Sequence, residues 1–451
     1  MPFIPHTEEE IKRMLDTIGV DSIDDLFDEI PPELISSRLA DVPERMSEME
    51  VTRYIKQMAQ QDGTPLCFAG AGSYEHHIPA AVWQLATRGE LYTAYTPYQP
   101  EVSQGTLQVI YEYQTMMAKL TGMEVSNASL YDGASALAEA VLMAVRVNRK
   151  SKSKTILIPD TLNPTYREVA YNIVHNQNIT LKSIAMDVTT GTIDRDSLAE
   201  FADDDITAVV IPQPNYFGLF EDADALTQWA HDKNALAIAV VNPISLALLK
   251  APGEWAENGA DICIGEGQPL GVPMSSGGPY FGFLTCKKAL VRQAPGRIVG
   301  RTTDLDGKVA YALTYQTREQ HIRRAKATSN ICTNQGLMVT AATIYMALLG
   351  NVGLKKVATA CLNNTESFKQ KLKTVDGIEL LFDGAGFHEF VIRVDGNAET
   401  IIEKMAAKNI VCGYNISEQF PQLGQVILLC ATETKTEADL DFFVDNLKAC
   451  L

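Results

Sequence analysis

The chain has 451 residues, of which 46% are hydrophobic and 21% are charged, and its net charge at pH 7 is −18. A chain of this length and hydrophobic content can bury a large core, and more than one domain is expected. The negative charge argues against a nucleic-acid-binding protein and against binding to anionic membranes, because both partners carry the same sign.

Targeting and metal-site signals are missing from the sequence pattern. The N-terminal stretch MPFIPHTEEEIKRML has neither the basic nor the apolar region of a signal peptide. No apolar run approaches the roughly 20 residues of a membrane span. The eight cysteines are scattered without CxxC pairs, and the seven histidines show no metal-ligand spacing. We therefore expect a cytoplasmic protein with reduced thiols, without a membrane segment and without a metal site.

Residues 1 to 60 are predicted to form a helical arm. Thr7 is a helix cap followed by three glutamates, and Gly19 ends the apolar stripe of this first helix. A second short helix is expected from Ser22, and a third from 46 to 61. Arms of this kind wrap a partner subunit or the main body of the protein.

Residues 64 to 103 differ in composition from the preceding arm, because they are rich in glycine, proline and aromatic residues. Tyr92, Tyr95 and Tyr98 follow one another at three-residue spacing and lead to Glu101. The prolines and the lack of periodicity predict an ordered loop. Such loops often carry function, although tyrosines in a loop also serve packing, and both interpretations stay open.

A helix is predicted over 105–121, and a second helix, 136–148, follows a run of small residues. Gly133, Ala134 and Ser135 lie at the start of this second helix, where free backbone N–H groups can bind an anion. Asp132 and Ser135 can equally be ordinary helix caps. The local pattern does not decide between the two.

Beyond this point strands and helices alternate regularly. The predicted strands are 155–158, 181–186, 206–212 and 236–241, and the helices between them are 163–178, 196–201 and 223–233. Near-continuous apolar strands with helical crossovers predict an α/β fold with a mostly parallel sheet that is covered on both faces. Polar residues follow directly after the strand ends, where ligands bind in such folds.

The stretch 261–286 is predicted to be a strand, a loop rich in glycine, proline and serine, and a second strand. Gln268 lies in this loop, close to the end of the first strand. Because ligands bind at strand ends in such folds, the side chain at position 268 decides which chemistry this loop can support.

A basic and polar stretch, 295–334, stands out in an acidic protein. Its cations are Arg318, Arg323, Arg324 and Lys326. They can form a solvated helix face or contact a phosphate, a carboxylate or another subunit. Helices at 335–349 and 353–375, followed by strands and two more helices, predict a small α+β domain over 335–451, which leaves 61–334 as the large domain.

Four strings resemble the glycine cleavage system P-protein family, in particular the alpha subunit of its two-subunit form. They are EEEIKRMLDTIGVDSIDDLFDEIP, the run from ELYTAYTPYQPE to GASALAEA, GADICIGEGQPLGVPMSSGGPYFGF and IRRAKATSNICTNQ. The resemblance covers essentially the whole chain. It implies the PLP-dependent transferase fold, that is aminotransferase fold type I, for the large domain.

The resemblance also implies an activity. The family decarboxylates glycine on pyridoxal phosphate (PLP) and passes the aminomethyl group to the lipoyl arm of the H protein. This chemistry needs a Schiff-base lysine and a carboxylate that keeps the pyridine nitrogen protonated. The alpha subunit is implied to work with a beta subunit, as two alpha plus two beta.

Alignment on Pro273 and Gly277-Gly278-Pro279 places Gln268 at the lysine position, and Asn242 stands at the position of the pyridine-facing acid. An amide cannot form an imine. Lys250, expected in a helix beyond its strand, and the lysines after the next strand do not replace it. The cup formed by Gly133, Ala134 and Ser135 remains as a vestige of a phosphate site.

We therefore expect a chain that binds no cofactor covalently and is inactive alone, with PLP on the beta subunit. The aromatic loop (Tyr92, Tyr95, Tyr98, Glu101) and the basic segment (Arg318, Arg323, Arg324, Lys326) are expected to shape the beta subunit's pocket or the approach of the H protein. Two alternatives are a PLP enzyme that uses another lysine and a scaffold or regulator without a glycine cleavage role.

Overall fold

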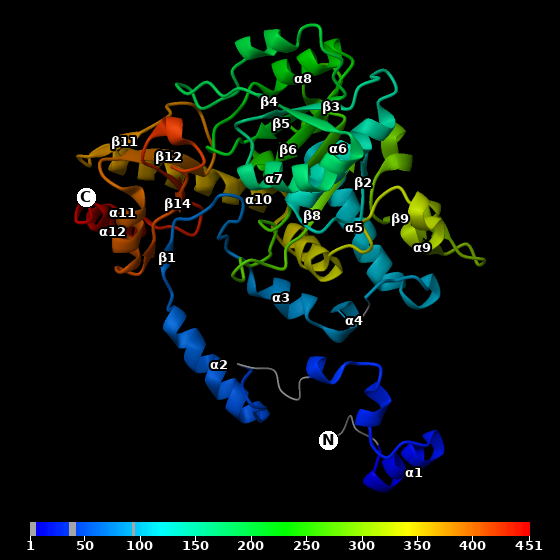
Figure 1. Cartoon of the computed structure of the whole chain (residues 1–451). Coiled ribbons are helices and arrows are strands. Elements are labelled where there is room, and N and C mark those ends of the chain that lie inside the picture. The colour runs from blue at the N-terminus through cyan, green and yellow to red at the C-terminus, as the bar shows by residue number, and fades with distance from the viewer. Residues whose placement is uncertain (1–5, 36–41, 93–94) are drawn as a thin grey trace. The chain divides into compact units, whose positions relative to one another are not determined.

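The structure is a computed structural model that describes residues 6–35, 42–92 and 95–451. It divides into two compact units, Met1–Gly63 and Thr64–Leu451 (Figure 1). Each unit is described separately below.

The first unit contains the predicted arm helices. Helix α1 (Glu8–Ile18) begins with a capping box between Thr7 and Glu10 and ends at Gly19, whose φ of 88° is left-handed. Helix α2 (Glu48–Asp62) begins with a second capping box, formed by Ser47 and Glu50. Between them the described residues form two short 3-10 turns, at Asp24–Phe27 and Pro32–Leu34, so the second predicted helix is shorter than expected.

None of the described residues of this unit is buried. Large apolar side chains such as Ile18, Leu34 and Met49 are 60%, 70% and 68% exposed. Local capping explains why the helices form, but the unit has no core of its own to cover their apolar sides.

The second unit is built on a seven-stranded sheet with the order β2-β8-β7-β6-β5-β3-β4. Strands β3 to β7 are parallel to one another, and β8 runs antiparallel between β2 and β7. The mostly parallel α/β sheet is therefore confirmed. The strands are β2 (Val125–Ser126), β3 (Thr155–Pro159), β4 (Thr180–Ile184), β5 (Ala208–Gln213), β6 (Leu236–Val241), β7 (Ile262–Glu266) and β8 (Gly282–Cys286).

Alternate residues of the central strands face two separate cores. Val209 and Ile211 of β5 pack in one core, whereas Ala208 and Val210 pack in the other. Because both faces are covered, the strands read as continuous apolar runs in the sequence. The helices that supply the two covers are α5 (Gln104–Thr121), α8 (Ala223–Asp232) and α10 (Gly336–Leu372) on the first face, and α6 (Gly133–Val147) and α7 (Pro164–Val174) on the second.

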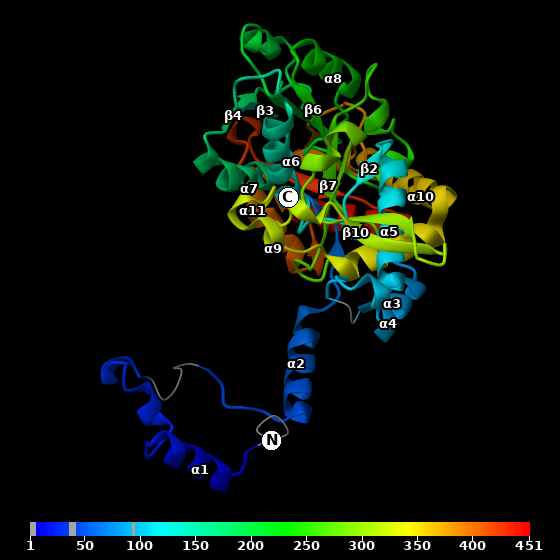
Figure 2. The ribbon, with the colours of Figure 1, turned by 90° about the vertical axis from the view of Figure 1, so that its right-hand side faces the viewer.

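Helix α10 contains a break at Gly350, whose φ of 57° and ψ of −172° are not helical. The break separates the two helices that the sequence predicts. Among the described helices α10 is long and apolar enough to cross a membrane, but half of its apolar window is buried inside the protein. Figure 2 shows it beside α5 and the short helices α3 (Ala80–Ala86) and α4 (Gly89–Tyr92), so its apolar side serves packing.

The C-terminal part is α+β, as predicted. Its antiparallel sheet has the order β11-β12-β15-β14, and helices α11 and α12 pack beside it. A short parallel pair, β1 with β13, links this part to the start of the second unit. The elements are β1 (Leu66–Cys67), β11 (Ile378–Leu380), β12 (Glu389–Val394), α11 (Ala398–Ala406), β13 (Ile410–Val411), β14 (Tyr414–Asn415), β15 (Val426–Cys430) and α12 (Glu437–Lys448).

The structure excludes one alternative that the sequence left open and shows two local predictions to be wrong. The stretch 295–334 is not a helix face: it starts with a hairpin of β9 (Ile298–Thr303) and β10 (Val309–Thr314) and continues in short turns around α9 (Gln320–Arg323). The stretch 64–103 is not only loop, because it contains α3 and α4. Lys250 lies outside any helix, and its amine pairs with Asp224 at 2.9 Å.

Candidate functional site

The carboxyl end of β7 meets the first turn of α6. The carboxylate of Glu266, the last residue of β7, accepts a hydrogen bond at 3.0 Å from the backbone N–H of Gly133. Its other oxygen accepts one at 3.1 Å from the N–H of Gln268. Asp132 caps the same helix by accepting from the N–H of Ser135 at 2.7 Å. Asp132 and Ser135 are therefore ordinary caps, and the group bound at this helix start is a carboxyl group of the chain itself.

Burial shifts the titration of Glu266. Removal from water raises the pKa of this carboxyl to about 8, although the two backbone N–H donors act in the opposite direction. The negative charge of Asp132 adds to the increase. The side chain is only partly buried, because one side of it lines a small cavity.

Gln268 is enclosed, with 1% of its surface exposed. Its amide N–H2 donates to the carbonyl oxygens of Tyr74 and Val272, both at 2.8 Å, and its oxygen accepts from the N–H of Tyr74 at 2.9 Å. The amide thus cross-links two loops and has no reactive role. Its hydrogen-bonding capacity is used for structure.

Asn242 directly follows β6 and is half-buried. Its oxygen accepts from the N–H of Ile244 at 2.9 Å, and its amide nitrogen lies 3.1 Å from Nε2 of His388. Burial holds the pKa of His388 well below its usual value, and nearby His76 adds to the effect. His388 is therefore neutral, and Asn242 faces an imidazole with no net charge.

The cavity between these residues is small, at about 70 Å³. Ligand pockets for small molecules and cofactors measure roughly 300–1,000 Å³. Glu266 and Glu389 line it together with Asn242, Tyr74 and Tyr166, and no basic side chain is found among its described lining residues. The space suits a few water molecules and does not fit a phosphorylated cofactor.

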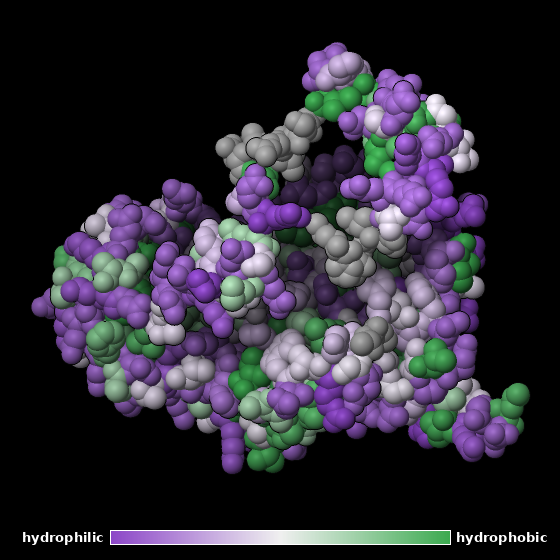
Figure 3. Space-filling model, turned by 90° about the horizontal axis from the view of Figure 1, so that it is seen from below, coloured by the Kyte–Doolittle hydropathy of each residue, from purple (hydrophilic) through white to green (hydrophobic). Residues whose placement is uncertain are grey.

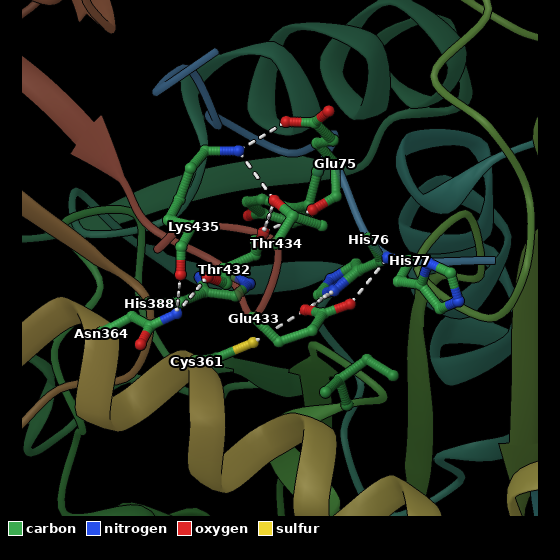
Figure 4. A network of polar contacts seen from close by, with 12 residues as sticks. Glu75, His76, His77, Cys361, Asn364, His388, Thr432, Glu433, Thr434 and Lys435 are labelled. Atoms are coloured by element: carbon green, nitrogen blue, oxygen red, sulfur yellow. Dashed lines mark hydrogen bonds and ion pairs between the residues drawn. The ribbon is translucent and has the colours of Figure 1, made fainter. Parts of the chain in front are cut away.

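The glycine-rich loop that carries Tyr74 is held by the C-terminal part. Glu389 of β12 accepts from the N–H of Ala71 at 2.6 Å and from the hydroxyl of Tyr74 at 2.7 Å. Burial raises the pKa of this carboxyl to about 7, against the effect of both donors. Lys435 pairs with Glu75 at 2.5 Å further along the loop (Figure 4).

His76, Cys361 and Glu433 form a buried cluster within the same network (Figure 4). Their potential ligand atoms lie within 4.8 Å of one another, and a histidine, cysteine and carboxylate set is one that zinc can use. In the structure Glu433 lies 2.7 Å from His76 Nδ1 and accepts from the Cys361 thiol at 3.3 Å. The three groups bond to one another, so the cluster fastens the loop to α10.

The fold brings part of the aromatic loop against the basic segment. The hydroxyl of Tyr98 accepts a hydrogen bond at 3.0 Å from the guanidinium of Arg297, which also lies 5.3 Å from the tyrosine ring centre. Arg297 is 3% exposed and also donates to the carbonyl oxygen of Cys332 at 2.8 Å. Tyr98 further packs edge-on against His321 at 5.3 Å between ring centres.

The other predicted contact residues divide into structural and exposed ones. Arg318 donates to the carbonyl oxygens of Ala294 and Gly296, the latter at 3.0 Å, so it fixes the start of the hairpin. Tyr95 is 82% exposed and Tyr92 is 55% exposed, while Thr93 and Ala94 lie outside the described residues. The remaining exposed residues of the predicted set are Tyr98, Glu101, Arg323, Arg324 and Lys326.

Sequence reasoning missed two residues of this region. Glu266 carries a visible signal, since an acid ends an otherwise apolar strand, but its partner Gly133 is 133 residues away in the chain. Arg297 follows a proline and a glycine and resembles any solvent-exposed arginine in the sequence. Only the fold shows that it is buried.

Comparisons with known proteins place this geometry in a family. The model of the glycine cleavage system P-protein matches residues 1–447. The probable glycine dehydrogenase (decarboxylating) subunit 1 of Thioalkalivibrio sulfidiphilus is 61% identical over 451 residues, which cover 100% of both chains.

Solved structures support the same family and fold. A crystal structure of glycine decarboxylase (P-protein) of the glycine cleavage system, in inhibitor-bound form, is 39% identical with a TM-score of 0.89 and full coverage of both chains. A C-DES mutant with glycine linked to its PLP cofactor shares the fold alone, at 14% identity, a TM-score of 0.62, and coverage of 87% of this chain and 98% of that one. The fold is that of PLP-dependent fold type I enzymes, and the chain belongs to the glycine cleavage system P-protein family.

Proposed function

We propose that this chain is the alpha subunit of a two-subunit glycine dehydrogenase (decarboxylating), and that it works without a cofactor of its own. Relatives that match it over their full length carry the name subunit 1, which implies a partner subunit. The observation that carries the proposal is the enclosed amide of Gln268, with its three hydrogen bonds, at the position where the resemblance requires a lysine.

The surroundings of Gln268 support the same conclusion. Asn242 faces a neutral imidazole and offers no negative charge to a pyridine nitrogen. The cavity of about 70 Å³ has no room for PLP and no basic side chain among its described lining residues. In the proposed complex the cofactor is held by the beta subunit, where it supplies the electron sink for glycine decarboxylation.

This chain's own contribution is then its surface. We place the contact with the beta subunit's pocket, or with the approaching lipoyl arm of the H protein, on the exposed side chains of the aromatic loop and the basic segment. Tyr92 and Tyr95 are exposed, and Tyr98 is held in place by Arg297. Exposed aromatic and arginine side chains on an anchored loop are typical of protein interfaces. Figure 3 shows hydrophobic residues in green scattered among hydrophilic ones in purple on the face that it draws.

The proposal includes an assembly of two alpha and two beta subunits in the cytoplasm. The arm supports a partner role, because its capped helices expose apolar side chains and none of its described residues is buried. Apolar surface of this kind is stabilised when a partner covers it.

The test is reconstitution. Exchange of carbon dioxide with glycine is measured for this chain alone, for the beta subunit alone and for the mixture, each with PLP and the lipoylated H protein. The expected result is full exchange only in the mixture. Exchange by this chain alone, or an undiminished rate for the beta subunit alone, would reject the proposal.

A further inference from the structure

The first turn of α6 is the part of this chain that corresponds to the phosphate site of a PLP enzyme, and it is already filled. The carboxylate of Glu266 lies 3.0 Å from the N–H of Gly133, where a helix start attracts an anion. Its second oxygen is bound by the N–H of Gln268 at 3.1 Å. We propose that Glu266 is an internal plug, which takes the place of a phosphate group and closes this site against phosphorylated ligands, PLP included.

Steric packing at Gly133 keeps the end of β7 close to the start of α6. A Cβ atom built on Gly133 would lie 2.1 Å from the hydroxyl oxygen of Tyr166 and 2.9 Å from the backbone nitrogen of Glu266. The space on the Cα side of the glycine is thus taken by Tyr166 and by the backbone of Glu266. The close approach of Tyr166 and of the end of β7 therefore requires a glycine at position 133 and holds Glu266 against the helix start.

Charge acts in the same direction. The described residues that line the cavity include two carboxyl groups, Glu266 and Glu389, and no arginine or lysine. Phosphate sites in proteins normally combine helix N–H groups with a basic side chain. An incoming phosphate would therefore gain no cationic partner.

The plug determines which subunit binds the cofactor, and this inference rests on the proposed function. If this chain only contributes surface to the beta subunit's active site, PLP bound to this chain would serve no purpose. The missing lysine alone prevents only the covalent bond. Noncovalent PLP could still occupy an open cup, whereas a filled cup excludes it. Gln268 thus prevents covalent attachment of the cofactor, and Glu266 prevents its noncovalent binding.

The experiment titrates the isolated full-length chain with inorganic phosphate, followed by calorimetry and by the melting temperature. The wild type, Glu266→Ala, Glu266→Gln and Glu389→Ala are compared. Removal of the Glu266 side chain frees the Gly133 N–H and opens space, so Glu266→Ala is expected to bind phosphate at least tenfold more tightly than the wild type. The melting temperature of this variant then rises with phosphate concentration.

The other two variants are matched controls. Glu266→Gln keeps the space filled, and Glu389→Ala enlarges the same cavity without freeing the Gly133 N–H. Both are expected to bind phosphate no better than the wild type. Should Glu266→Ala not fold, Glu266→Asp takes its place, since it withdraws the carboxylate by one methylene, and the same gain is expected.

Two results would overturn the plug: phosphate binding by the wild type as tight as by the opened variant, or no gain in a folded opened variant. Neither result touches the reconstitution test, which measures glycine exchange. A failed reconstitution together with the expected phosphate titration would reject the proposed function and leave the plug standing. The reverse combination would reject the plug alone.

Discussion

Two regions of the molecule that the sequence marks as functional turn out to be opposites. Around Gln268 the polar groups are enclosed and hydrogen-bonded. The amide of Gln268 makes three hydrogen bonds, and Glu266 accepts one from the N–H of Gly133. Around Tyr95, which is 82% exposed, the side chains face solvent on a loop anchored at Tyr98 by Arg297.

Under the proposed function, this difference separates an interior without catalytic groups from a surface that serves a partner. A pocket without its reactive group is filled, because enclosed polar groups without partners cost free energy. Exposed side chains need no internal hydrogen-bond partners, because water hydrates them until a partner protein covers them. The enclosed polar groups of the interior therefore stabilise the fold, whereas the exposed side chains of the loop stay accessible to solvent.

The largest expected effect comes from restoring the lysine. Gln268→Lys breaks the hydrogen bond from the N–H of Tyr74 and places a cation in an enclosed site, so we expect a loss of about 3 kcal/mol or more in the free energy of unfolding. No internal aldimine is expected with PLP, because the cup is filled. Urea unfolding and absorbance spectroscopy measure the two effects. Gln108→Lys, on the exposed side of α5, is the control, and a stable Gln268→Lys variant that forms the imine would contradict the comparison.

The next effect concerns the anchor of the exposed region. Arg297→Ala removes donors to Tyr98, Thr333 and the carbonyl oxygen of Cys332. We expect a loss of about 2–3 kcal/mol in stability, together with a lower exchange rate in the complex. The exposed Arg301→Ala, on β9, is the control and should change stability by no more than about 0.5 kcal/mol. Equal stability of the two variants would show that the loop is not anchored by Arg297.

A smaller effect is the pH dependence that the plug introduces. The folded chain holds the Glu266 proton up to about pH 8, whereas the unfolded chain releases it near the ordinary value of 4.5. Stability is therefore lost as pH rises through this interval, by about 2 kcal/mol for a partly buried group. Unfolding of Glu266→Gln between pH 5 and pH 9 should lack this decline. Glu389→Gln should remove the part of the stability loss that is complete near pH 7, because the pKa of Glu389 is raised only to about 7. A wild-type slope in Glu266→Gln would contradict the assignment.

The smallest effect is expected at the exposed loop. Tyr95→Ala should leave stability within about 0.5 kcal/mol of the wild type, since the side chain is in water. In the reconstituted complex the exchange rate should fall by about tenfold, which corresponds to about 1.4 kcal/mol. Tyr171→Ala, on α7 and 54% exposed, is the matched control and should leave the rate unchanged. An unchanged rate for Tyr95→Ala in an intact complex would remove the loop from the contact surface.

Local signals in the sequence predicted much of the fold. Thr7 and Gly19 predicted both ends of α1, and apolar runs predicted the parallel strands, because capping and burial act on neighbours in the chain. The β9–β10 hairpin was missed, since its exposed residues read as polar loop. The Asp306-Gly307 pair at its turn is the signal that could have found it.

The candidate site was predictable in one respect only. Gln268 and Asn242 follow strand ends, so their chemistry could be compared with what the family needs. The role of Glu266 depends on Gly133, and that of Arg297 on Tyr98, 199 residues away. Pairings over such distances follow from the tertiary fold, and no local pattern contains them.

The most direct test of the central claim asks which polypeptide carries the cofactor. The active mixture of both subunits is reduced with borohydride, which fixes any imine, and the two chains are separated and weighed by mass spectrometry. The account predicts that the mass of reduced PLP is found on the beta subunit and that this chain keeps its unmodified mass. Reduced PLP on a lysine of this chain would contradict it.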